Sequence, residues 1–153
     1  MKTCFFIGHR NAPIALQEEL NRSVEKMVLE YGITDFVVGS HGNFAHMAIA
    51  AIQKMKLLHP ERKAYLLIAN HPFDRVPFLP EHFDSTFYPY SLETSPKRFA
   101  IKKANQLMLM QSDCLIAYVN RSGGNSAEIL KKARRLELEG QLRVFNLGND
   151  LLF

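Results

Sequence analysis

Short segments rich in glycine and histidine follow the apolar runs of this sequence, and their chemistry suits the binding of an anion. One of them, "GSHGN", begins directly after an apolar run that ends at Val38 and directly before a helix-like pattern. Glycines let backbone N–H groups approach a ligand closely, and the N-terminus of a following helix favours negative charge. The segment therefore predicts a site for a phosphate-bearing molecule.

Four such segments occur, and all consist of small, polar or basic residues. They are Gly8–Arg10, Gly39–Asn43, Asn70–Pro72 and Asn120–Ser126. Together they hold five of the eight glycines and three of the six histidines, so we expect them to form one site. Glycine also eases tight turns between strands and helices, and this alternative stays open for each segment alone.

The residues that we expect to contact the ligand lie in these segments or on a helix that faces them. They are Gly8, His9, Arg10, Gly39, Ser40, His41, Gly42, Asn43, Asn105, Gly123, Gly124, Asn125 and Ser126. Arg10 offers a planar fork for phosphate or carboxylate, or forms a surface salt bridge. Asn105 falls on a core-facing stripe of a predicted helix, so it either orients a loop or touches the ligand.

Glu128 is the candidate catalytic residue. It lies three residues after Asn125, a spacing that fits a capping arrangement at a helix start. Alternatively, its carboxylate accepts hydrogen bonds from ribose hydroxyls and assists the departure of a base. The three histidines His9, His41 and His71 have no carboxylate at metal-ligand spacing, so we predict no metal site, and nothing indicates a cofactor.

Five apolar runs alternate with helical patterns and must position these residues. The expected strands are Thr3–Ile7, Asp35–Gly39, Ala64–Ala69, Cys114–Val119 and Leu142–Leu147, and the expected helices follow Pro13, begin near Phe44, and span Ser95–Gln111 and Ser126–Glu139. Such alternation predicts an α/β, Rossmann-like three-layer sandwich, with a five-stranded, mainly parallel sheet and helices on both faces. Right-handed crossovers favour the strand order 3-2-1-4-5, and we expect residues 1–153 to form one domain.

The predicted topology determines where a ligand would bind. In open α/β sheets, ligands bind outside the carboxyl ends of the strands, where the strand order reverses. With the order 3-2-1-4-5, this point lies between the first and fourth strands. The long irregular segment from Asn70 to Ser95 holds four prolines and six aromatic residues, and we expect it either to fold over a base as a lid or to pack over a helix.

Composition narrows the class of protein. A chain of 153 residues, 47% of them apolar, is long enough to bury one core without disulfides, and Cys4 and Cys114 are expected to be buried and reduced. No signal peptide or membrane span is evident, so we expect a cytoplasmic protein without a membrane partner. The net charge of +4 mildly favours anionic partners but does not by itself indicate nucleic acid. The apolar tail Asp150–Phe153 suggests self-association into a homo-oligomer.

Four stretches taken together resemble the SLOG superfamily. They are "CFFIGHR" at the start, "GSHGNFAHMA" after the second predicted strand, "PKRFAIKKANQLMLMQSDCLIAYV", and the "GG" that follows. The branch that looks most similar consists of small bacterial proteins of unknown function, and the resemblance covers nearly the whole chain. It implies a Rossmann-like fold that binds nucleotides or nucleotide-derived ligands.

The resemblance also implies site roles at matched positions. Gly8 and Arg10 match the first motif, Gly39, Gly42 and Phe44 the second, Asn105 and Met108 an Arg-Asn-x-x-Met-like pattern, and Gly123 and Gly124 the phosphate-binding loop. Some relatives, the Lonely Guy phosphoribohydrolases, cleave the bond between a base and ribose 5′-phosphate, and others bind DNA or are proposed to sense nucleotide signals. Ala45 and Ala104 replace residues common in relatives, and the run from Ser122 to Glu128 is shorter.

These departures favour binding over hydrolysis. The function that we expect is the binding of a nucleotide or phosphorylated nucleoside at the carboxyl edge of the sheet. The alternative is a nucleotide phosphoribohydrolase or N-glycosidase-type hydrolase that uses Glu128. A nucleic-acid-processing role has only the positive charge in its favour, so a nucleic-acid partner is not expected.

Overall fold

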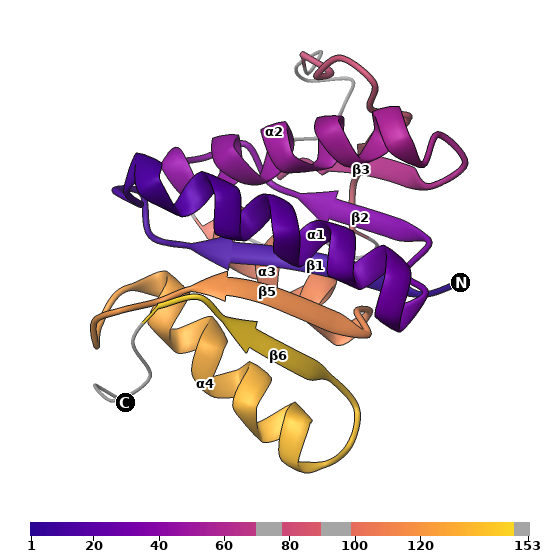
Figure 1. Ribbon diagram of the computed structural model, residues 1–153. Coiled ribbons are helices and arrows are strands. Elements are labelled where there is room, and N and C mark those ends of the chain that lie inside the picture. Colours follow the sequence, from indigo (N-terminus) through magenta and orange to yellow (C-terminus); the bar gives the residue numbers. More distant parts are fainter. Residues whose placement is uncertain (70–77, 90–98, 149–153) are drawn as a thin grey trace.

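Six parallel strands form one sheet in the computed structural model, which describes residues 1–69, 78–89 and 99–148 (Figure 1). The strands are β1 (Thr3–Gly8), β2 (Asp35–Val38), β3 (Lys63–Leu67), β4 (Ser85–Phe87), β5 (Cys114–Tyr118) and β6 (Arg143–Asn146). Their order is β4-β3-β2-β1-β5-β6, and every neighbouring pair is parallel. The predicted Rossmann-like α/β class is confirmed, and the five expected strands lie in the expected order.

The sixth strand, β4, corrects the prediction of an irregular segment between Asn70 and Ser95. Its three residues pair with β3 from Tyr65↔Ser85 to Leu67↔Phe87, a length too short to show an alternating pattern. Asp84 fixes its start, because the carboxylate accepts hydrogen bonds from the Ala64 N–H at 2.8 Å and from Lys56 Nζ at 2.9 Å. These contacts come from distant parts of the sequence, so local composition gave no sign of the strand.

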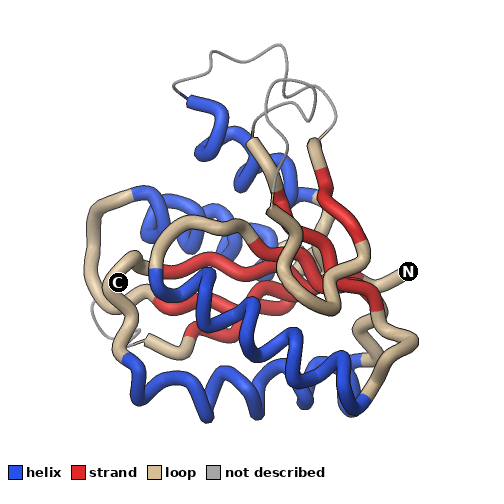
Figure 2. The backbone as a smooth tube through the Cα atoms, turned by 90° about the horizontal axis from the view of Figure 1, so that it is seen from above, coloured by secondary structure: helices blue, strands red, loops and turns tan. Residues whose placement is uncertain are grey.

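Two layers of helices enclose the sheet (Figure 2). A short 3-10 helix, η1 (Ile14–Leu16), leads into α1 (Gln17–Tyr31), which packs with α2 (Asn43–Leu58) on one face, while α3 (Ala100–Met110) and α4 (Asn125–Leu138) cover the other. Alternation along β1 serves both layers, since Cys4 and Phe6 join the α1–α2 core and Phe5 joins the α3–α4 core. No helix in the described ranges is both long and apolar enough to cross a bilayer.

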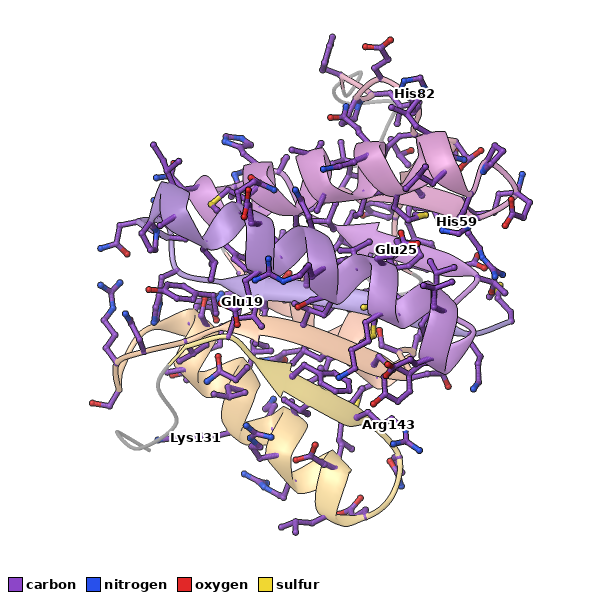
Figure 3. The ribbon with its side chains drawn as sticks, in the orientation of Figure 1. Glu19, Glu25, His59, His82, Lys131 and Arg143 are labelled. Atoms are coloured by element: carbon purple, nitrogen blue, oxygen red, sulfur yellow. The ribbon has the colours of Figure 1, made fainter. Side chains whose placement is uncertain are left out.

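The α1–α2 layer is also joined by a polar contact. His59, directly after α2, lies 2.7 Å through Nε2 from Glu25 Oε1 of α1, and both side chains lie near the same end of the layer (Figure 3). The two helices run in the same direction because each connects neighbouring parallel strands by a right-handed crossover. Their N-termini therefore both lie near the carboxyl edge of the sheet.

Aromatic residues of the irregular segment contribute to the core. Phe83 is buried in the α1–α2 core, and Phe87 and Tyr88 pack against the α3–α4 core. These three rings therefore follow the packing alternative, whereas the side chain of Phe78 is exposed and belongs to neither core. Phe73 and Tyr90 lie outside the described residues.

The two cysteines are free and buried, as predicted. Cys4 of β1 and Cys114 of β5 are register partners in the middle of the sheet, and both side chains join the α1–α2 core. Burial raises the pKa of both thiols above the usual range, which suppresses the reactive thiolate. They act as small apolar side chains of the core.

Candidate functional site

The carboxyl ends of β1 and β5 lie side by side where the strand order reverses. Gly8 and Tyr118 are register partners, and the chain leaves them toward opposite faces, to α1 after β1 and to α4 after β5. The segments Gly8–Arg10, Gly39–Asn43 and Asn120–Ser126 all follow strands at this edge, on the left of Figure 1. The structure thus brings three of the four predicted segments to one edge, and the fourth, Asn70–Pro72, lies outside the described residues.

Two helices begin at this edge with glycine at the N-cap. Gly42 before α2 has φ 87° and ψ 169°, and Gly124 before α4 has φ 85° and ψ 171°. Only glycine adopts this region of backbone conformation readily. Neither helix has a side-chain hydrogen bond from the described residues at its cap. At α4 the first N–H groups therefore keep the capacity to bind an acceptor, whereas the first N–H of α2 is already bonded within the protein.

The glycines divide into two groups by what surrounds them. At Gly39, Gly123 and Gly124, an added Cβ would meet no heavy atom of the described residues within 4 Å, so these positions leave open space there. Gly123 and Gly124 are exposed and directly precede the uncapped helix α4. Their absence of side chains therefore leaves the approach to the α4 N–H groups clear.

Gly8 and Gly42 instead permit close packing inside the protein. A Cβ at Gly8 would lie 2.4 Å from Cγ of Phe44, and one at Gly42 would lie 2.9 Å from Cα of Arg10. The N–H of Asn43 donates to the carbonyl of Arg10 at 2.9 Å, which fastens the start of α2 to the loop after β1. These two glycines are required by the contact of α2 with the end of β1.

His9 joins the loops after β1 and β5. Its side chain is 4% exposed, and its Nε2 accepts a hydrogen bond from the backbone N–H of Asn120 at 3.2 Å. The backbone N–H of His9 donates to the Tyr118 carbonyl at 3.2 Å, and the His9 ring meets the Tyr118 ring edge-on. Burial and the nearby charge of Arg121 lower the pKa of His9, which favours the neutral imidazole.

Ser126 makes a second connection between α4 and β1. Its hydroxyl donates to the Gly8 carbonyl at 3.0 Å. The hydroxyl is therefore engaged within the protein, and any anion at this helix would contact backbone N–H groups. Asn120 is held in turn, because its Nδ2 donates to the Tyr118 hydroxyl at 3.0 Å.

A small pocket lies beside the same strand ends. Its volume is about 60 Å³, and it is lined by Phe6, Ile7, Gly8, Gly39, His41, Phe44, Ala45, Ile101 and Asn105. Asn105 of α3 is half-buried, and within the described part of the chain its side-chain amide has no hydrogen-bond partner. Whole-ligand sites measure several hundred cubic ångströms, so this pocket has room for one end of a ligand that lies along the edge.

Glu128 lies on the first turn of α4 and pairs with α3. Its carboxylate is 2.7 Å from Lys102 Nζ, and this hydrogen bond and charge lower the pKa of Glu128. The predicted capping arrangement is wrong, because Gly124 is the N-cap and Asn125 is the first helical residue. Glu128 is ionised at neutral pH, which makes it unsuited to donate a proton as a general acid.

This pairing gives a prediction for the titration of Glu128. Replacing Lys102 by methionine is expected to raise the pKa of Glu128, because the strongest stabilisation of its carboxylate is removed. The control Lys103→Met removes a neighbouring cation that does not pair with Glu128, and it should leave the titration unchanged. Carboxyl ¹³C NMR as a function of pH measures both variants, and equal midpoints in the two would contradict the assigned pair.

Cations also face this edge. Arg10 and Arg121 are exposed, and neither forms an ion pair with the residues that the structure describes. Arg121 was not among the predicted site residues, although its place two residues before Gly123 could have identified it. Ser40, His41, Asn43 and Asn125 are exposed at the same edge. Among the described residues, no three metal-ligating side chains converge.

Comparison with known proteins assigns this chain to no family. Neither a protein-family model nor a curated protein sequence matches this chain. The resemblance to the SLOG superfamily therefore stays a prediction. Since one α/β fold supports many unrelated functions, the functional argument depends on the geometry of this edge.

Proposed function

We propose that this protein binds a nucleotide or a phosphorylated nucleoside at the carboxyl edge of β1 and β5. The observation that carries the proposal is the start of α4, where an uncapped helix follows two open glycines, Gly123 and Gly124, beside the exposed Arg121. A phosphate there would accept hydrogen bonds from the first N–H groups of the helix and would gain from the positive end of its dipole.

The rest of the ligand would extend toward the pocket beside Gly8. Gly8 lies next to both the start of α4 and the pocket, because its carbonyl accepts a hydrogen bond from the Ser126 hydroxyl of α4 and its backbone lines the pocket. In the pocket, the amide of Asn105 has no hydrogen-bond partner among the described residues and offers both a donor and an acceptor group, and Phe44 and Ile101 supply apolar surface. This combination suits the polar edge of a base or sugar.

Hydrolysis is not part of the proposal. The Glu128 carboxylate is paired with Lys102 and does not line the pocket. We also propose that the chain belongs to the SLOG superfamily. The order of the quoted motifs and the Rossmann-like fold support this membership, which accords with a nucleotide-binding role. A cytoplasmic location and a bacterial source belong to the same proposal.

A thermal-shift series tests the proposed ligand class. At 100 times the Kd, a ligand stabilises the folded state by about 2.7 kcal/mol, which corresponds to a rise in Tm of roughly 5–10 °C for a domain of this size. We expect such a rise with AMP, a smaller one with ribose 5-phosphate, and none with adenosine. A rise with adenosine equal to that with AMP, or no rise with any phosphorylated compound, would overturn the proposal.

A further inference from the structure

We propose that His9 is a positioning residue whose neutral imidazole holds the loop Arg121–Gly124 in place, and that protonation of His9 releases this loop. The loop is the one that leads into the N-terminus of α4. The functional meaning of the proposal rests on the proposed phosphate site, but the movement itself is a property of the free protein.

The contact between His9 and Asn120 requires an uncharged acceptor. Nε2 accepts the Asn120 backbone N–H at 3.2 Å, so in this arrangement the ring proton is on Nδ1. An imidazolium carries a proton on both nitrogens and would set one N–H against another. Because the side chain is 4% exposed, the ring has no open solvent into which to turn while the loop remains in place.

The loop has few other attachments. Arg121, Ser122, Gly123 and Gly124 are exposed, and within the described chain their only hydrogen bond is the carbonyl of Gly124 accepting the Glu128 N–H inside α4. Before the loop, the backbone N–H of Asn120 is bonded to His9 and its side chain to the Tyr118 hydroxyl, and after the loop the Ser126 hydroxyl is bonded to the Gly8 carbonyl. Loss of the His9 contact therefore removes the only backbone hydrogen bond that Asn120 makes to the described residues, and leaves on that side the exposed bond of its side chain.

The charged groups around the imidazole favour the neutral form. Burial lowers the pKa of His9, the charge of Arg121 in the loop itself lowers it further, and Arg10 follows His9 in the chain. From β5 the neighbour is the ring of Tyr118, and the nearest acid on α4, Glu128, is paired with Lys102. No carboxylate among the described residues pairs with His9, so nothing there would hold an imidazolium in place.

NMR of the free protein between pH 8 and pH 4.5 tests the release. We expect the chemical shifts of the His9 ring nitrogens and of the Asn120 backbone amide to change with one common pH midpoint. This midpoint should lie below the ordinary histidine pKa of about 6.5. In His9→Gln the side-chain oxygen can accept the same N–H without titrating, so the Asn120 amide should stay unchanged. Arg121→Gln should move the common midpoint upward. An Asn120 amide that is unaffected while His9 titrates would overturn the proposal.

A second measurement links the release to ligand affinity. The Kd of AMP is measured at pH 7.5 and pH 5.0 for the wild type and for His9→Gln, so that protonation of the AMP phosphate cancels in the comparison. We expect the wild type to lose at least about threefold more affinity than the variant. An equal loss, or a smaller loss in the wild type, would refute the regulatory role. Absence of AMP binding to both proteins at pH 7.5 would refute the proposed function and leave the NMR result to decide the loop release.

Discussion

Replacing Gly8 by alanine is expected to lower the free energy of unfolding by about 1–3 kcal/mol. The new Cβ would lie 2.4 Å from Cγ and 2.5 Å from Cδ2 of Phe44, distances at which one of the two groups must move. Phe44 cannot move freely, because its ring is 1% exposed and stacks on Tyr118 at a centroid distance of 6.3 Å. The strain therefore falls on the contact between α2 and the end of β1.

Gly39→Ala is the matched control for this prediction. Gly39 belongs to the same edge, has no positive φ, and has no heavy atom from the described part of the chain within 4 Å of the position of a Cβ. Its replacement should change stability by less than about 0.5 kcal/mol, as is usual for open surface positions. The free energies of unfolding of the two variants are compared by urea denaturation, with one m-value fitted to both. Equal stabilities would mean that the ring of Phe44 does not constrain Gly8.

A double variant identifies the source of the strain. Phe44→Ala removes Cγ and Cδ2, the two atoms nearest to the Gly8→Ala methyl, so the two changes together should cost less than the sum of their separate effects. Residues in direct contact commonly show coupling energies of about 0.5–3 kcal/mol. Additive effects would place the cost of Gly8→Ala in the backbone and not in this contact.

The strand order could be predicted from the sequence because each of the five long strands is a separate apolar run. The run from Thr3 to Ile7 reads as a buried strand, and the structure places it inside the sheet, between β2 and β5. Parallel strands need crossover helices, and the alternation of runs with helical patterns supplied them. The three-residue strand β4 is held by pairing with β3 and by Asp84, and neither signal is local.

The site was predictable at the level of segments but not of contacts. Strand ends in a parallel sheet share one edge, so the grouping of Gly8, Gly42 and Gly124 followed from topology alone. The contact of His9 with Asn120 joins residues 111 positions apart, and that of Ser126 with Gly8 joins residues 118 apart. Such pairs depend on how neighbouring loops meet, and a single sequence does not encode them by spacing.

Because the sequence does not show how neighbouring loops meet, it also could not separate glycines that have different roles in the structure. Gly8 and Gly123 both follow strands at the switch point of the sheet, yet a Cβ would collide with Phe44 at one and meet open space at the other. The difference arises because α2 packs directly on the end of β1, while the loop after β5 projects from the surface. The glycines that remain candidates for ligand contact are those without an internal packing reason.

Gly124→Ala is expected to remove most of the AMP affinity while leaving the protein folded. The N-cap conformation of Gly124, with φ 85° and ψ 171°, costs a residue with a side chain about 1–3 kcal/mol, so the first turn of α4 should rearrange. Rearrangement turns the first N–H groups away from a shared acceptor. If the phosphate contributes most of the binding energy through these groups, we expect Kd to rise at least about tenfold, or 1.4 kcal/mol.

Gly140→Ala separates this effect from a general loss of stability. Gly140 lies after the other end of α4, also has a positive φ, of 76°, and also has open space at the position of a Cβ. Its replacement should cost about 1 kcal/mol of stability, comparable with Gly124→Ala, while the Kd of AMP stays within about twofold of the wild type. Calorimetric titration and urea denaturation of both variants give the two quantities. Because both glycines flank the same helix and both have a positive φ, equal Kd values in the two variants would mean that the anion does not bind at the N-terminus of α4.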